Sequence, residues 1–191
     1  MDDRLYRLLR IIAVAMILAW VVWAIYDRVR VAEPGDDSYL AANTLFEDGF
    51  YERALTTYQD TLAEAPDHLP ALRGMANSLI QLDRHEDGLI TIARAIQLDP
   101  VFPGHYATRG IIHDHLGRFE LAMADYRRAL EEDPELAEGM HWLDRLLHNL
   151  PETPPTIADR LAYLRDQMAL PPADRVLRVP EIDANQRPIE K

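Results

Sequence analysis

The strongest constraint on the fold of this chain is a sequence pattern that returns every 34 residues between positions 35 and 136. Prolines mark the pattern at Pro66, Pro100 and Pro134. Six further registers keep the same interval over three units: Ala42, Ala76 and Gly110; Gly49, Asp83 and Gly117; Tyr51, His85 and Phe119; Ala54, Gly88 and Ala122; Tyr58, Ile92 and Tyr126; and Thr61, Ala95 and Ala129. A period of this length predicts a solenoid, in which each unit buries its apolar face against the next.

The chemistry of the registers fits units of two short antiparallel helices. Two registers hold only small residues, which lets neighbouring helix backbones approach closely. Gly49 and Gly117 can adopt the left-handed conformation that ends a first helix, and Asp83 is a tolerable substitute there. Large residues in the fifth register fill the space between one unit and the next. A proline after the second helix stops that helix and sets the following turn.

These residues, most clearly in the stretch GRFELAMADYRRALEEDP, resemble the tetratricopeptide repeat family over residues 35–134. The resemblance implies an all-α solenoid of three helix pairs, followed by the capping helix that such arrays need. Leu143 and Leu147 continue the apolar phase of a first helix and place that cap. The first unit departs from the pattern, with Thr61 where alanine is usual. The expected domain spans 35–150, with repeats at 35–68, 69–102 and 103–136 and the capping helix at 137–150.

An uncharged stretch of sixteen residues, Ile11–Tyr26, precedes the repeats. As a helix it would be about 24 Å long, against roughly 30 Å for the hydrocarbon core of a bilayer. Arg7 and Arg10 can snorkel to the interface, and aromatic residues gather at the far end. We expect a single transmembrane helix over 11–31 after a short cytoplasmic segment, 1–10. A cleaved signal peptide and a buried core helix are the alternatives.

The charge balance around this stretch predicts where the repeats lie. Arg4, Arg7 and Arg10 precede it, whereas only Arg28 and Arg30 follow closely, so the N-terminus is expected inside and the repeats outside. Of the 20 basic residues all but Lys191 are arginine, which is typical of a GC-rich bacterium. The resulting expectation is a membrane-anchored bacterial protein of the inner membrane, single-pass, with a periplasmic tetratricopeptide domain.

The family resemblance implies that the first helix of each unit lines a concave groove for a protein partner. The candidate groove residues are Tyr39, Asn43, Phe46, Arg73, Asn77, Ile80, Ala107, Ile111, His115, His141 and Arg145. Asn43 and Asn77 share one register, and an amide there can both donate to and accept from an extended peptide backbone. The alternative is that both amides are simply solvated. The repeats contain no lysine, which argues against a lysine clamp on a terminal carboxylate.

Composition removes several other functions. The chain has no cysteine and a net charge of −12, so thiolate chemistry is excluded and binding to nucleic acid is not expected. His113 and His115 lie two residues apart on a helix and cannot chelate together, while His141 and His148 lack a third ligand. We therefore expect no metal, no cofactor and no enzymatic activity. A composite site of His113, His115 and His141 is the remaining enzymatic alternative.

The last part of the chain, 151–191, is a proline-rich tail that contains one more helical pattern. Thr156 with Asp159 resembles a capping arrangement before an apolar stripe, which predicts a short amphipathic helix near 156–170. The stretch VLRVPEI, 176–182, is too apolar to be only a solvated tail, and we expect it to become ordered on contact with something.

The expected function is a membrane-anchored scaffold for protein–protein interaction. It would act like an adaptor or chaperone in the assembly or stabilisation of a bacterial inner-membrane or periplasmic complex. Only residues 32–35 separate the apolar stretch from the repeats, which favours partners that are membrane-embedded or periplasmic. A permanent accessory subunit of a membrane enzyme complex is the alternative.

Overall fold

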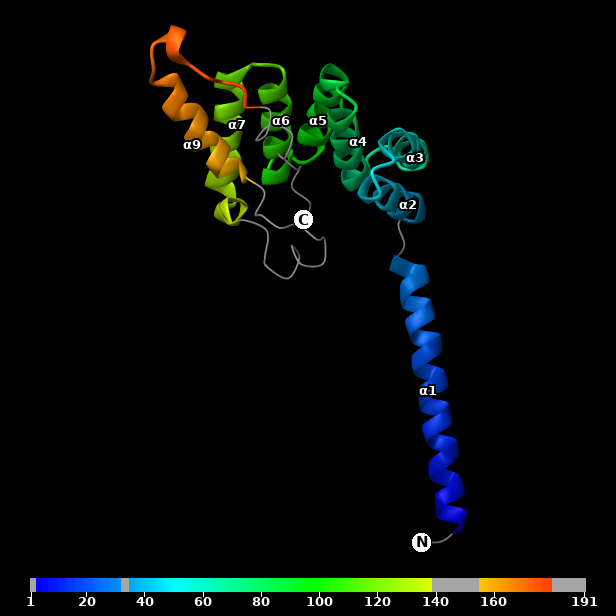
Figure 1. Ribbon diagram of the computed structural model, residues 1–191. Coiled ribbons are helices and arrows are strands. Elements are labelled where there is room, and N and C mark those ends of the chain that lie inside the picture. Colours follow the sequence, from blue (N-terminus) through cyan, green and yellow to red (C-terminus); the bar gives the residue numbers. More distant parts are fainter. Residues whose placement is uncertain (1–2, 32–34, 139–154, 180–191) are drawn as a thin grey trace.

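The structure is a computed structural model that describes residues 3–31, 35–138 and 155–179. These residues form eight α-helices and two short 3₁₀ helices, with no strand among them. The elements are α1 (Asp3–Val31), α2 (Asp36–Glu47), α3 (Tyr51–Glu64), α4 (Leu69–Gln81), α5 (His85–Leu98), α6 (Pro103–His115), α7 (Phe119–Glu132), η1 (Pro134–Ala137), α9 (Ile157–Met168) and η2 (Pro172–Asp174). Figure 1 shows α2 to α7 stacked in succession as a curved array, with α1 extending away from it.

The predicted solenoid of helix pairs is confirmed. The second helices, α3, α5 and α7, begin at Tyr51, His85 and Phe119, which are 34 residues apart, and each is 14 residues long. Within each unit the two helices pack on each other, and α3 and α5 also pack on the first helix of the next unit. The first helices end two residues before the register of Gly49, Asp83 and Gly117, and the second helices end two residues before the proline register.

The turn inside each unit has the backbone conformation that the sequence predicts. Gly49, Asp83 and Gly117 have φ angles of 79°, 56° and 72°, in the left-handed region. The amide that follows each of them donates back to a carbonyl five residues earlier, for example from Arg118 to His113 at 2.8 Å. This bond satisfies a carbonyl at the end of the first helix. Asp83 therefore fills a glycine position, as an aspartate can.

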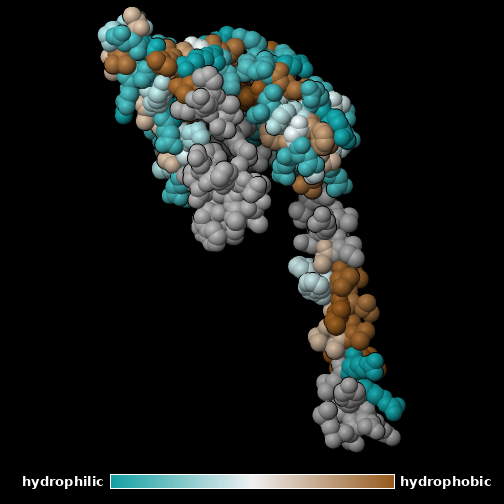
Figure 2. Space-filling model, viewed as in Figure 1, coloured by the Kyte–Doolittle hydropathy of each residue, from teal (hydrophilic) through white to brown (hydrophobic). Residues whose placement is uncertain are grey.

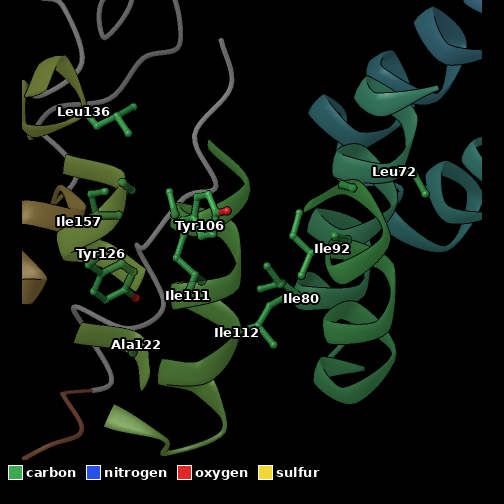
Figure 3. Close-up of a cluster of buried hydrophobic side chains, with 14 of the residues drawn as sticks. Leu72, Ile80, Ile92, Tyr106, Ile111, Ile112, Ala122, Tyr126, Leu136 and Ile157 are labelled. Carbon is green, nitrogen blue, oxygen red and sulfur yellow. The ribbon is translucent and has the colours of Figure 1, made fainter. Parts of the chain in front are cut away.

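The core consists of the small and large registers in alternation. Ala42, Ala54, Ala76 and Ala122 are completely buried, and the large residues at 58, 92 and 126 fill the spaces beside them. A larger core cluster joins the second and third units to α9, and a smaller one lies within the first unit and the start of α4. In Figure 3, Ile80, Ile92 and Ile112 lie close together between the second and third units. Apolar burial between successive units therefore holds the array together.

The helix α9 lies where the sequence predicts a short amphipathic helix. The Thr156 hydroxyl accepts from the Asp159 amide while the Asp159 carboxylate accepts from the Thr156 amide, which completes a capping box. Ile157 and Leu164 are buried against the third unit. The capping helix expected at 137–150 lies outside the described residues beyond position 138. Among the residues that the structure describes, α9 covers the end of the array.

The helix α1 exposes an apolar surface, which Figure 2 shows over its middle part. Ile11, Met16, Trp20 and Trp23 are each at least 60% exposed. No helix in the described parts of the chain is both long enough and apolar enough to cross a membrane, so the transmembrane helix expected over 11–31 is not found. The uncharged stretch of sixteen residues is shorter than the roughly 20 residues that a span requires.

Candidate partner-binding groove

A pocket of about 260 Å³ opens between α2 and α4, on the inner side of the first two units. Its lining residues come from α2, α3 and α4: Tyr39, Asn43, Phe46, Tyr58, Pro70, Arg73, Gly74 and Asn77. Five of these are candidate groove residues from the sequence. The 34-residue register brings them together, because it places the same face of α2 and α4 side by side. The pocket has the size of one large side chain and aromatic walls on two sides.

The pocket depends on a close approach between Tyr58 and Gly74. A Cβ atom on Gly74 would lie 2.3 Å from Cζ of the Tyr58 ring, a separation that packed atoms do not tolerate. The glycine therefore leaves room for Tyr58 to reach from α3 past α4. Its hydroxyl then donates a hydrogen bond of 2.6 Å to Oδ1 of Asn43. The floor of the pocket is fixed by this contact.

The two asparagines of the shared register have different surroundings. Asn43 is engaged on both sides of its amide, since Oδ1 accepts from Tyr58 and Nδ2 donates to the Tyr39 hydroxyl at 3.4 Å. Asn77 is 96% buried, and its Oδ1 has no hydrogen-bond partner. A buried acceptor without a donor loses the hydrogen bond that water would have supplied. Asn77 therefore lines the pocket while its carbonyl oxygen remains buried behind the pocket surface without a donor.

Three candidate groove residues, Ile80, Ala107 and Ile111, are buried in the core and do not line the pocket. This corrects the sequence-based expectation. Ile80 lies one helical turn after Ala76, so it shares the core-facing side of α4 and packs between the units. Ala107 and Ile111 occupy the registers of Arg73 and Asn77, but in the third unit these positions belong to the core cluster against which Leu177 packs.

The remaining candidates are not brought to the pocket. His115 lies at the end of α6, where its ring stacks on His85 with centroids 4.8 Å apart. His141 and Arg145 lie outside the described residues, so the proposed extension onto the cap and the composite histidine site are not seen. Within the described ranges, no three histidine, aspartate or glutamate side chains are grouped as a metal would require.

Solved structures show which fold this array has. The first repeat domain of RPAP3 bound to the Hsp90 peptide SRMEEVD superposes with a TM-score of 0.58 at 18% identity, covering 72% of this chain and 94% of that one. The tetratricopeptide domain of Sgt2 from Aspergillus fumigatus gives a TM-score of 0.54 at 20% identity, covering 76% and 89%. The helix pairs have the tetratricopeptide fold.

Sequence comparisons support the tetratricopeptide repeat family. A family model described as tetratricopeptide repeat matches residues 75–147, and one described as anaphase-promoting complex, cyclosome, subunit 3 matches residues 24–95. Hsp70-Hsp90 organizing protein 2 of Arabidopsis thaliana is 28% identical over 56% of this chain and 19% of its own length. The CTR9 homolog of Arabidopsis thaliana is 31% identical over 50% of this chain and 9% of its own length. The chain thus spans only a small part of these relatives.

Arg73 is the one charged residue among those that line the pocket. The Arg73 guanidinium lies 4.8 Å above the Phe102 ring, and Phe102 also contacts His105. Burial and the charge of Arg73 lower the pKa of His105 to about 4. Burial likewise lowers the pKa of His113. Both imidazoles are therefore neutral at pH 7, and Arg73 supplies the positive charge on this side.

Reasoning from the sequence alone missed Tyr58 and Gly74 at the pocket and the Arg160–Asp114 ion pair at the third unit. Tyr58 was assigned to packing between units, although its hydroxyl also forms the pocket floor. Gly74 could have been found from the sequence, because a glycine in the middle of a helix, where it cannot serve as a cap, indicates a close contact with a neighbouring residue. The Arg160–Asp114 ion pair gave no signal, because the partners are 46 residues apart and Arg160 lies outside the repeat pattern.

Proposed function

We propose that this chain is an interaction module that binds an extended segment of another protein in the pocket between α2 and α4. The observation that carries the proposal is the buried, unpartnered Oδ1 of Asn77 at the pocket wall. A backbone N–H of an extended segment can supply the missing donor when the Asn77 side chain turns its oxygen toward the pocket on binding. A groove of this kind gains affinity from main-chain hydrogen bonds and specificity from the side chain that enters the pocket.

The shape of the pocket favours a bulky apolar side chain beside that hydrogen bond. Tyr39 and Phe46 form aromatic walls, and the Tyr58 hydroxyl is already used by Asn43. Aromatic walls bury large apolar groups well and leave few polar atoms to satisfy. The ligand we propose is therefore an extended segment with one large apolar residue, flanked by a backbone N–H that Asn77 accepts.

The proposed activity is binding without catalysis and without a cofactor or metal. The buried carboxylate of Asp125 stabilises the fold, because it accepts two hydrogen bonds from the Arg109 guanidinium, at 2.6 and 2.8 Å. This pairing raises the pKa of Arg109. The lowered pKa values of His105 and His113 follow mainly from burial. A neutral histidine that contacts no reacting group is a packing residue.

A selection experiment tests this function directly. Random heptapeptides are displayed and selected on the full chain, and the affinity of the enriched peptides is measured by fluorescence anisotropy. Asn77→Ala is expected to weaken binding at least tenfold, because the peptide N–H loses its acceptor. Gln81→Ala on the exposed side of the same helix is the matched control and leaves the affinity unchanged. Equal affinities for Asn77→Ala and the unaltered chain would remove the proposal.

A second candidate ligand is an acidic C-terminal peptide. It is favoured by the RPAP3 structure in complex with SRMEEVD and by the presence of Arg73 in the pocket. The two candidates differ in their need for a free carboxylate. Peptide SRMEEVD with a free or an amidated C-terminus distinguishes them. Tighter binding of the free form supports the acidic C-terminal peptide, whereas equally weak binding of both forms supports the apolar segment.

The proposal includes attachment of the array to a membrane through α1, in a bacterial inner membrane with the repeats in the periplasm. This proposal is supported by the exposed apolar surface between Ile11 and Trp23, which the array does not cover. Arg7 and Arg10 lie next to this surface in the sequence. An exposed apolar surface of this size marks a site for lipid or for another protein. Membrane fractionation with alkaline extraction tests it, and a chain that remains entirely in the soluble fraction contradicts it.

The partner relation has two forms, a transient adaptor in complex assembly and a permanent accessory subunit. The open pocket supports the adaptor, whereas α9 and the segment after it, which add fixed surface beyond the repeats, support the subunit. Purification in detergent through a tag on Lys191 separates them. One complex in a fixed ratio indicates a subunit, and several proteins in low amounts indicate an adaptor.

A further inference from the structure

The segment after α9 is held in an extended form by side chains of α9. The Val176 amide donates to Oε1 of Gln167 at 2.8 Å, and the Val176 carbonyl accepts from the Tyr163 hydroxyl at 2.6 Å. The Leu177 carbonyl accepts from Nη2 of Arg160 at 3.0 Å. Positions 160, 163 and 167 share one face of a helix. A single stripe of α9 thus binds three main-chain groups of two successive residues, as a groove binds a peptide.

The same segment also contacts the third unit. The Leu177 side chain packs against the large core cluster, and Nη2 of Arg178 donates to the carbonyl of His115 at the C-terminal end of α6. The carbonyls at a helix C-terminus carry partial negative charge, which favours a guanidinium there. Residues 175–178 therefore connect α9 to α6 by one apolar contact and one charged contact.

The repeat register identifies the surface that this segment and α9 cover. Asp114 in the third unit is the counterpart of Phe46, which lines the open pocket of the first unit. Asp114 is buried and accepts two hydrogen bonds from Arg160, at 2.7 and 2.8 Å. The inner face of the third unit, which would otherwise be a groove, is thus closed by Arg160 and by the segment that Arg160 holds.

We infer that the face formed by α6 and α9 is a second peptide-docking surface, occupied in cis by residues 175–178. The partner that fits it is an extended segment with a large apolar residue followed by a basic one, as in Leu177–Arg178. The apolar residue would pack against the core cluster, as Leu177 does, and the basic residue would donate to the carbonyl at the C-terminal end of α6, as Arg178 does. Such a partner binds by displacing the chain's own segment, so access to this surface is controlled by the tail.

A matched pair of substitutions in the full-length chain tests this inference. Leu177→Asp places a charge against the core cluster and releases the segment, whereas Val176→Asp introduces the same charge on a side chain that is 56% exposed. The probe is a fluorescent peptide with the sequence of residues 173–182, ADRVLRVPEI. We expect the Leu177→Asp chain to bind the probe at least tenfold more tightly than either the unaltered chain or Val176→Asp. A tethered segment has a high effective concentration and outcompetes the probe in both of those chains.

Amide exchange provides a second readout that does not depend on the affinity of the probe. The Val176 amide is expected to be protected in the unaltered chain and in Val176→Asp, and to lose protection in Leu177→Asp while the α9 amides keep theirs. Equal probe binding by all three chains, absence of binding to Leu177→Asp, or an unprotected Val176 amide in the unaltered chain would each overturn the inference. Asn77→Ala leaves these results unchanged, so they are independent of the pocket between α2 and α4.

Discussion

The two ends of the array use the same repeat registers in opposite ways. In the first unit, Tyr58 extends its hydroxyl toward the inner side and supports an open pocket beside Asn43. In the third unit, Tyr126 occupies the same register, but its hydroxyl donates to the buried carboxylate of Asp114. That carboxylate is in turn paired with Arg160 of α9. The first unit thus offers its inner face to a partner, and the third unit has its inner face closed.

The difference shows that the repeat fixes the array but not which part of it binds. The first-helix positions at 43, 77 and 111 share a register, yet the residue there is half-buried in the first unit and completely buried in the third. The repeat pattern is nearly the same in both. In the third unit, α9 and Leu177, which lie outside the repeat, pack on the core cluster that contains Ile111.

The largest expected effect is loss of the ion pair that closes the third unit. Asp114→Ala leaves the Arg160 guanidinium buried without its carboxylate, which lowers the free energy of unfolding by about 3–5 kcal/mol. Urea denaturation measures it. Asp87→Ala, which breaks the exposed pair with Arg84, is the control and changes stability by about 0.5 kcal/mol or less. A loss of less than about 1 kcal/mol for Asp114→Ala would show that the third unit is not held closed by this pair.

A smaller effect is expected from filling the space that supports the open pocket. Gly74→Ala places a methyl group against the Tyr58 ring and is expected to destabilise the chain by about 1–3 kcal/mol. Gly88→Ala is the matched control: its new Cβ meets the terminal methyl group of Ile112 at 3.2 Å and no other atom closer than 3.8 Å, and alanine stands at this register in the other two units. Thermal unfolding of both variants measures the difference. Equal melting temperatures would contradict the proposed role of Gly74.

Acid is expected to weaken the closed end through His105. Its folded pKa of about 4 lies below the unfolded value of about 6.5, so only the unfolded state binds the proton between these values. Stability is therefore lost as the pH falls below about 6.5. Between pH 7 and 5.5 the loss is about 1 kcal/mol. Urea titrations of the unaltered chain and of His105→Leu at both pH values measure it, and the same loss in both chains would refute it.

The smallest expected effect separates the two asparagines of the pocket. Asn43→Ala removes the acceptor of the Tyr58 hydroxyl and is expected to cost about 1 kcal/mol of stability. Asn77→Ala removes an acceptor that has no partner, so we expect no loss of stability and only a loss of peptide affinity. Denaturation and anisotropy on both variants give the comparison. Equal losses of stability would show that Asn77 is already satisfied in the free chain.

The array could be predicted well from the sequence because the same types of residue recur at the same positions in three units. The glycine register gave the turns, including Asp83 at a positive φ, and the registers of small residues gave the packing. The capping box at Thr156 was also visible, because its two partners are three residues apart. Local patterns of this kind are set by neighbouring residues and can be read directly.

The sites were predicted less well because they depend on contacts between distant positions. Five groove residues reach one pocket, but Ile80, Ala107 and Ile111 are buried by packing that the repeat does not encode. The pairing of Arg160 with Asp114 and the seat of Leu177 on the core need the tertiary structure. A single repeat pattern cannot show that its last unit is covered.

The most direct test of the contrast between the ends is amide exchange on the full chain with and without a peptide selected on it. We expect the peptide to add protection in α2 and α4, around Asn43 and Asn77, and to leave the protection of α6, α9 and residues 175–178 unchanged. New protection in α6 and α9, with α2 and α4 unchanged, would contradict it.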